Sequence, residues 1–279
     1  MIASYQAEVI RSRKRWANWI LVGILLLLLL AFGYVITYLV FTHPPPRFES
    51  RIPPSTLKRE TFPENLLPDI LTGMTTAGAA VMIILGGLST ASEYGWLTVQ
   101  TILVQRPGRS AVLLGKLLNL AIIVLVVSIA SLGAAAIASE IIVRIDGSTS
   151  SFPSATMLLK GFGALYLQLA VWTAFGMFLG IAFRSTAAAI GGGLTYLFVV
   201  EAILGQLLAN TSGVKEVLKF LPGTNAIAVN AAFPLSYRSE QVMPALVSAG
   251  RGVITLLVYL ALFAIVSLLI FQRRDVTGA

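Results

Sequence analysis

Long apolar runs that carry almost no charged side chains dominate the hydrophobic pattern of this chain. A helix needs about 20 mostly apolar residues to cross the roughly 30 Å hydrocarbon core of a bilayer. Measured against that length, the sequence predicts six membrane-spanning helices, at 16–42, 69–90, 112–140, 158–183, 187–209 and 252–272. We therefore expect an all-α, polytopic membrane protein that forms one transmembrane domain over residues 1–279.

The segments outside the spans have their own patterns. Residues 1–15 place Ile2, Tyr5 and Val9 on one helical stripe, followed by a basic cluster, which predicts a short helix in the membrane interface. Residues 43–68 contain seven prolines and are expected to form an extended, proline-stiffened loop. Residues 210–251 are apolar but interrupted by prolines, which predicts short re-entrant helices before the last span.

Glycine and polar residues predict how some spans meet. Only residues 184–186 separate the fourth and fifth spans, so these two should form a tight helical hairpin. Gly176-x-x-x-Gly180 has the small-residue spacing of helix contacts, and the run 191–193 of three glycines also allows close packing.

Composition and charge agree with a membrane protein and indicate an orientation. Hydrophobic residues make up 57% and charged residues 11% of the chain, whereas a soluble domain carries about 25% charged residues. The net charge of +8 fits topology setting and anionic lipid headgroups better than nucleic acid. Ten Lys and Arg residues fall on each side, but the external segments are longer. The denser basic side, which includes the cluster at 11–15, therefore predicts N-in and C-in.

The sequence contains no motif that is typical of a catalytic or nucleotide-binding site. It has no cysteine and a single histidine, His43, which leaves no thiolate site and little scope for a histidine-based metal site or triad. The nearest approach to a phosphate-binding loop runs from Gly108 to Lys116, where six residues instead of four separate the glycines and Leu117 replaces the hydroxyl residue. We expect no enzymatic activity, cofactor or metal in this chain; ATP-driven work would need an ATPase in another chain.

The cytoplasmic stretch at 89–118 has more amphipathic order than a connector requires. Its polar and apolar residues at 97–105 fall at helical spacings, and the turn Arg106-Pro107-Gly108-Arg109 then breaks the helix. A short helix lying across the spans, followed by a basic turn, suits a contact that transmits force.

This loop resembles that of the ABC type-2 permease family. There an acidic residue, a small residue, a Thr-hydrophobic pair, a Pro-x-Arg-like turn and a Gly-Lys-Leu segment recur in this order. The matching residues are Glu93, Gly95, Leu97, Thr98, Pro107, Arg109, Gly115 and Lys116. The general layout is similar over the whole chain, but the proline-rich loop at 43–68 is longer than the family pattern, which leaves room for an external partner.

The resemblance implies a membrane-spanning exporter subunit in the plasma membrane of a bacterium or archaeon. Residues 92–106, within the cytoplasmic loop 91–111, would form a coupling helix that docks on a nucleotide-binding subunit, which holds ATP and Mg²⁺. Glu93 would bond near the end of the second span or to the ATPase. A second permease copy or a paralogue would complete the pathway. The implied coupling residues are Glu93, Tyr94, Thr98, Val99, Ile102, Arg106, Pro107 and Arg109.

One ionisable residue lies within the predicted fifth span. Glu201 is expensive to place in hydrocarbon and is therefore a candidate pathway residue, together with Gln168. The alternative is a structural hydrogen bond from Glu201 to Tyr196, Gln168 or the re-entrant segment.

Two other functional classes stay open from the sequence. One is a non-transport scaffold or assembly module that holds an external partner through 43–68, and the other is an ion-coupled carrier that uses Glu201. If the chain is an exporter subunit, its apolar interior favours lipids, hydrophobic drugs or peptides over small ions as substrates.

Overall fold

The computed structural model describes residues 2–44, 53–95, 108–204, 214–233 and 245–273, with the backbone alone at residues 2, 3, 94, 95, 109, 202, 204 and 214. Helices make up most of these ranges, and no β-strand occurs in them. The first part of the chain forms α1 (Ile2–Lys14), α2 (Trp16–Leu28), η1 (Leu29–Ile36), α3 (Thr37–Thr42), α4 (Pro54–Lys58), η2 (Arg59–Thr61), η3 (Pro63–Asn65), α5 (Leu66–Gly73), η4 (Met74–Gly78) and α6 (Ala79–Gly95). The second part forms α8 (Arg109–Asp146), α9 (Ala155–Phe183), α10 (Thr186–Thr195), η5 (Tyr196–Leu204), α12 (Val214–Leu218), α13 (Pro222–Asn230) and α14 (Ala249–Arg273).

Five helical stretches are long and apolar enough to cross a membrane, which makes this an integral membrane protein. They correspond to five of the six predicted spans and cover Trp16–Thr42, Pro63–Glu93, Ser110–Asp146, Ala155–Phe183 and Ala249–Arg273. The remaining predicted span, 187–209, corresponds to α10 and η5. Its apolar helix, Thr186–Glu201, is shorter than the other five, and residues 205–209 lie outside the described residues.

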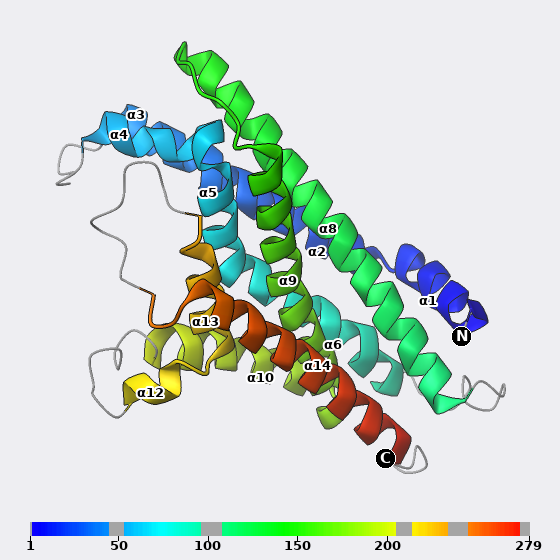
Figure 1. Ribbon diagram of the computed structural model, residues 1–279. Helices are drawn as coiled ribbons and strands as arrows, with labels where there is room; N and C mark the ends of the chain where they lie inside the picture. Colours follow the sequence, from blue (N-terminus) through cyan, green and yellow to red (C-terminus); the bar gives the residue numbers. More distant parts are fainter. Residues whose placement is uncertain (1, 45–52, 96–107, 205–213, 234–244, 274–279) are drawn as a thin grey trace.

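Helix α9 is the central helix of the bundle. In its most apolar stretch 89% of the residues are buried, against 11% in α14. Figure 1 shows α9 running between α6, α8 and α14, all of which contact it. The apolar surface of α14 and of α2, where Trp16 and Trp19 are exposed, fits a lipid environment, because hydrocarbon rather than water would cover it.

Glycines bring α6 and α9 into backbone contact. A Cβ atom at Gly86 would collide with the Thr173 carbonyl, and one at Gly176 would collide with the Ile83 carbonyl. Gly180 lies equally close to Thr90. The predicted packing role of Gly176-x-x-x-Gly180 is therefore confirmed. Of the glycines at 191–193, Gly193 packs closely against Ile83, whereas Gly191 faces open space.

The predicted extended loop at 43–68 is wrong for the part of it that the structure describes. Residues 54–65 form α4, η2 and η3, and α5 begins at Leu66. Pro54 and Pro63 lie at the first positions of helical turns. Proline is favoured there because its fixed φ suits a helix and its missing N–H would have no partner. The helical stretch of the second span consequently starts at Pro63 rather than at residue 69.

Helix α8 is longer than the predicted span at 112–140. Its 38 residues correspond to about 57 Å at 1.5 Å per residue, well above the roughly 30 Å of hydrocarbon. It ends at Asp146 and is followed by Gly147, whose φ of 68° gives the left-handed C-terminal cap. The side chain of Ser154 caps the start of α9 by accepting a hydrogen bond from the Met157 N–H.

The predicted tight turn between α9 and α10 is observed. Arg184 adopts a left-handed conformation with φ of 52°, and the Ser185 hydroxyl accepts a hydrogen bond from the Ala188 N–H at the start of α10. Two short helices, α12 and α13, precede the last span, and α13 packs against α14 and α5. Residues 234–244 lie outside the described residues.

Candidate functional site

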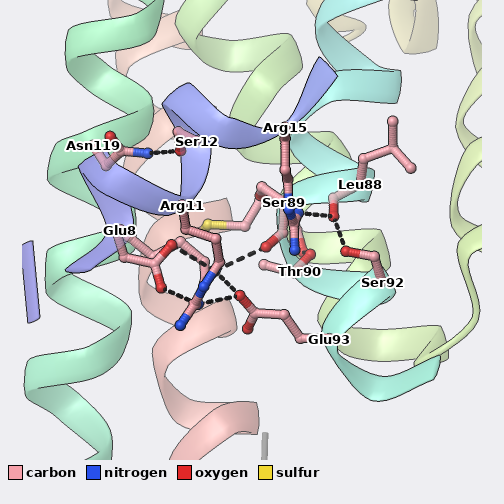
Figure 2. Close-up of polar contacts among 12 residues, drawn as sticks. Glu8, Arg11, Ser12, Arg15, Leu88, Ser89, Thr90, Ser92, Glu93 and Asn119 are labelled. Carbon is pink, nitrogen blue, oxygen red and sulfur yellow. Dashed lines mark hydrogen bonds and ion pairs between the residues drawn. The ribbon is translucent and has the colours of Figure 1, made fainter. Parts of the chain in front are cut away.

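A cluster of four charged side chains joins α1 to the facing ends of α6 and α8. Figure 2 shows Arg11 from α1 between two carboxylates. Its Nη1 atom lies 2.8 Å from Glu8 Oε1 and 2.7 Å from Glu93 Oε1. Lys116 Nζ, from α8, lies 3.1 Å from Glu8 Oε2 and 2.8 Å from Glu93 Oε1. We call Glu8, Arg11, Glu93 and Lys116 the charged cluster.

The charged cluster is electrically balanced and removed from solvent. Glu8, Glu93 and Lys116 are only 6%, 5% and 4% exposed, while Arg11 reaches the surface with part of its side chain. Two acidic and two basic side chains leave no formal charge. Buried charges are tolerated where ion pairs and further hydrogen bonds replace water, and Lys116 also donates to the Ser89 carbonyl at 2.8 Å. The cluster therefore links α1 to α6 and α8.

Backbone packing and neutral hydrogen bonds support the same contact. Gly115 lies against the α1 backbone, and an added Cβ atom would be 3.0 Å from the Tyr5 nitrogen. The Asn119 amide donates to the Ser12 hydroxyl at 2.6 Å, and Arg15 donates to the Leu88 carbonyl at 3.1 Å. The Gly-Lys pair of the sequence motif thus has a structural role: Gly115 gives α1 room, and Lys116 supplies the charge.

The structure places only part of the predicted coupling loop. Glu93 lies at the end of α6 and forms ion pairs within the chain, which is one of the two roles expected for it. Its side chain is buried, so Glu93 is not a solvated charge. Tyr94 and Arg109 lie on α6 and α8, with only their backbone described. Outside the described residues are Thr98, Val99, Ile102, Arg106 and Pro107.

A second, uncharged cluster joins α13 to α5, η4 and α9. The Gln168 amide donates to Asn230 Oδ1 at 2.6 Å. The Asn230 amide in turn donates to Thr75 Oγ1 at 2.9 Å and to the Leu71 carbonyl at 3.1 Å. Gln168 is fully buried. We call Thr75, Gln168 and Asn230 the amide cluster.

Glu201 holds the beginning of α13 through structural hydrogen bonds. Its Oε1 atom accepts from the Tyr196 hydroxyl at 3.0 Å and from the Gly223 N–H at 3.0 Å. Two of the structural partners considered for it, Tyr196 and the segment before the last span, are therefore observed. These hydrogen bonds join Glu201 and Gln168 to different partners. The two residues therefore belong to separate polar sites.

Several residues that form these sites were not singled out by sequence reasoning. On α1 the predicted apolar stripe comprised Ile2, Tyr5 and Val9, whereas the structure buries Glu8. A carboxylate three residues before Arg11, in an otherwise basic segment, was the available signal. Asn230 had no comparable signal because a single amide in a short helix is common. The described residues contain no group of three or more acidic or histidine side chains placed to hold a metal ion.

Comparison with known proteins gives a family but no activity. Residues 69–277 match the family described as "Protein of unknown function (DUF2705)", and the chain belongs to this family. The match includes Glu93 and Lys116 of the charged cluster and all of the amide cluster, whereas α1, with Glu8 and Arg11, precedes it. No curated protein matches the sequence.

Proposed function

We propose that this protein is the membrane-spanning permease subunit of an ABC exporter, with six spans, a cytoplasmic N-terminus and a cytoplasmic C-terminus. The five long apolar helices and the shorter apolar helix Thr186–Glu201 supply the spans. The motif at 93–116 supplies the resemblance to ABC type-2 permeases. In this proposal a separate subunit hydrolyses ATP, and a second permease copy or a paralogue completes the pathway.

The charged cluster is the observation that carries the proposal. A subunit that couples to an ATPase must transmit movement from a cytoplasmic loop to its spans. The helix ends next to the loop must therefore be held rigidly together. Residues 96–107 connect α6 to α8, and the cluster ties together the end of α6, the beginning of α8 and α1. Movement of the loop would therefore shift three helices as one unit.

The proposal divides the motif residues into two roles. Glu93 and Lys116 hold α1, α6 and α8 together, because both side chains are buried within the chain. The contact with the ATPase is assigned to the loop itself, at Thr98, Val99, Ile102, Arg106, Pro107 and Arg109. Tyr94, at the end of α6, is assigned to the same surface.

Co-purification of an ATPase partner tests the proposal. The tagged full chain, expressed with the reading frames that neighbour its gene, should co-purify with a subunit that carries a phosphate-binding loop and hydrolyses ATP. Arg109→Glu should reduce this hydrolysis because it reverses the charge of the coupling turn. Arg273→Glu, at the exposed end of α14, makes the same charge change and should have little effect.

Two results would overturn the proposal. One is purification without any ATPase, and an external protein bound instead would favour a scaffold that uses residues 43–68. The other is an intact complex whose ATP hydrolysis is the same in Arg109→Glu as in the unmodified chain.

The proposed orientation has a separate test. Because the chain contains no cysteine, single cysteines can be added without removing a native thiol. Ser55→Cys on α4 should react with an impermeant maleimide from outside the cell. Ser110→Cys at the start of α8 should react only after permeabilisation, and both positions are exposed. The reverse pattern would place the loop at 96–107 outside and exclude a cytoplasmic coupling role.

A further inference from the structure

A cavity of about 310 Å³ lies between the first two spans, and no residue of the two polar clusters lines it. One wall comes from α2, η1 and α3, and the other from α5 and η4. The lining residues are Leu25, Leu28, Leu29, Phe32, Gly33, Thr37, Asp69, Thr72, Gly73, Met74 and Ala77. This volume falls at the lower end of the roughly 300–1,000 Å³ of small-molecule sites.

The cavity is elongated and opens on the side of the bundle. On the first span its lining runs from Leu25 to Thr37, about 18 Å along a helix. Leu25, Leu29 and Met74 are buried at the inner wall, whereas Phe32 and Thr72 are exposed. A molecule could therefore enter from the lipid side and lie along the spans.

Asp69 is the single ionisable residue among those that line the cavity. Its Oδ2 atom is buried and makes no hydrogen bond to any described residue. It lies against Gly33, where an added Cβ atom would be 3.3 Å away. The Tyr34 hydroxyl interacts with the same carboxyl but does not reach hydrogen-bond geometry. No ion pair of Asp69 with Lys or Arg is formed within the described ranges. The carboxyl therefore has no cationic partner among the described residues.

The depth of Asp69 selects the ligand chemistry. It lies 24 residues before Glu93 on one continuous helical stretch, which is about 36 Å. With the charged cluster at one face of the bilayer, Asp69 lies near the opposite face, where lipid headgroups meet the roughly 30 Å of hydrocarbon. The rest of the cavity extends from this level toward the bilayer centre and is mostly apolar. The arrangement suits a cationic head attached to a hydrocarbon chain.

We propose that this cavity binds a long-chain ammonium compound, with Asp69 as the partner of the ammonium group and the apolar lining around its hydrocarbon chain. The ammonium group can belong to phosphatidylethanolamine of the bilayer or to a free amphiphilic amine. The site needs no ATPase and is independent of the proposed transport function.

The test uses the purified full chain in an uncharged maltoside detergent. Dodecylamine is titrated and binding is followed by native mass spectrometry, with dodecanol as the probe that has the same chain but no charge. Asp69→Asn keeps the shape of the side chain and removes its charge. Glu140→Gln removes a carboxylate that is paired with Arg144 on α8 and is absent from the cavity lining.

Asp69→Asn should weaken dodecylamine binding about tenfold or more, because it removes a charge-assisted contact, and should leave dodecanol binding unchanged. Glu140→Gln should alter neither. Gly33→Leu, which fills the cavity beside Asp69, should abolish binding of both probes. Equal dodecylamine binding by the unmodified chain, Asp69→Asn and Gly33→Leu would overturn the proposal.

A competition experiment identifies the source of the ammonium group. If phosphatidylethanolamine co-purifies and displaces dodecylamine, the natural ligand is the lipid. If dodecylamine binds through Asp69 but phosphatidylethanolamine does not compete, the site is for a free amine. In both cases the Asp69→Asn loss supports the site itself.

Discussion

The charged cluster and the amide cluster solve the same structural problem with different chemistry. Each attaches a short helix that does not span the membrane, α1 in one case and α13 in the other, to the long helices of the bundle. The charged cluster uses two carboxylates, a guanidinium and an ammonium. The amide cluster uses two amides and a hydroxyl, with no formal charge.

The two clusters lie toward opposite ends of the second span. Glu93 lies at the end of the helical stretch Pro63–Glu93, where the chain leaves the bundle. Thr75 lies 18 residues earlier, about 27 Å along a helix, and therefore toward the other end of the span. A buried charge left without its partner costs about 3–5 kcal/mol, whereas a buried neutral amide left unpaired costs about 1–3 kcal/mol. We therefore expect mutations in the charged cluster to lower the free energy of unfolding more than mutations in the amide cluster.

Loss of Lys116 should produce the largest effect. Lys116→Met keeps the length of the side chain but leaves Glu8 and Glu93 buried with Arg11 as the remaining cation of the cluster. Breaking a buried ion pair from one side costs about 3–5 kcal/mol. We expect a lower midpoint of thermal unfolding in detergent, together with faster proteolysis within α1.

Two further variants check this explanation. Adding Glu8→Gln to Lys116→Met should restore part of the lost stability because it removes the uncompensated negative charge. Lys219→Met, which breaks an exposed pair with Glu216, should barely change the midpoint. An equal loss in Lys116→Met and Lys219→Met would show that burial does not distinguish the charged cluster.

An intermediate effect is expected for the amide cluster. Asn230→Leu removes the acceptor of the Gln168 amide and the donor to Thr75 and Leu71. Leaving a buried neutral amide unpaired costs about 1–3 kcal/mol. Hydrogen exchange should increase in α13 and remain unchanged in α1. Faster exchange in α1 instead would mean that the two clusters are not independent.

The contribution of Glu201 to stability should depend on its hydrogen bonds rather than on its charge. Glu201→Gln keeps an oxygen acceptor for the Tyr196 hydroxyl and the Gly223 N–H, so we expect little change in stability. Glu201→Leu removes the acceptor and should cost about 1 kcal/mol or more. Thermal unfolding of both variants measures this difference. Tolerance of Leu would contradict the structural role, and loss of transport in a stable Gln variant would assign Glu201 to the pathway.

The smallest effect is expected at the edge of the charged cluster. Ser12→Ala removes the hydroxyl that accepts from the Asn119 amide without touching a charge. Its cost should be about 0.5–1.5 kcal/mol, the net contribution of an ordinary hydrogen bond. A loss as large as that of Lys116→Met would place the main contact of α1 at Ser12 rather than at the ion pairs.

Features that depend on local chemistry could be predicted from the sequence. The apolar runs predicted the long helices because a bilayer requires length and hydrophobicity, which neighbouring residues alone provide. The turn at 184–186 and close packing at Gly176 and Gly180 followed from short spacings, but the spacing did not identify α6 as the partner helix. The prolines of 43–68 wrongly predicted an extended loop, because proline is common in extended chain and also at the first position of a helix.

Only the tertiary structure decided which polar groups meet. Glu8 and Lys116 are 108 residues apart, Asn230 and Thr75 are 155 apart, and Asp69 meets Gly33 across two helices. No local pattern encodes such pairs, because each depends on how the helices pack. The sequence by itself determined that the chain is helical and enters a membrane, since those properties come from the composition of single segments. The positions of its buried charges and amides depended on packing, because a polar group in hydrocarbon is stable only where a partner from another segment reaches it.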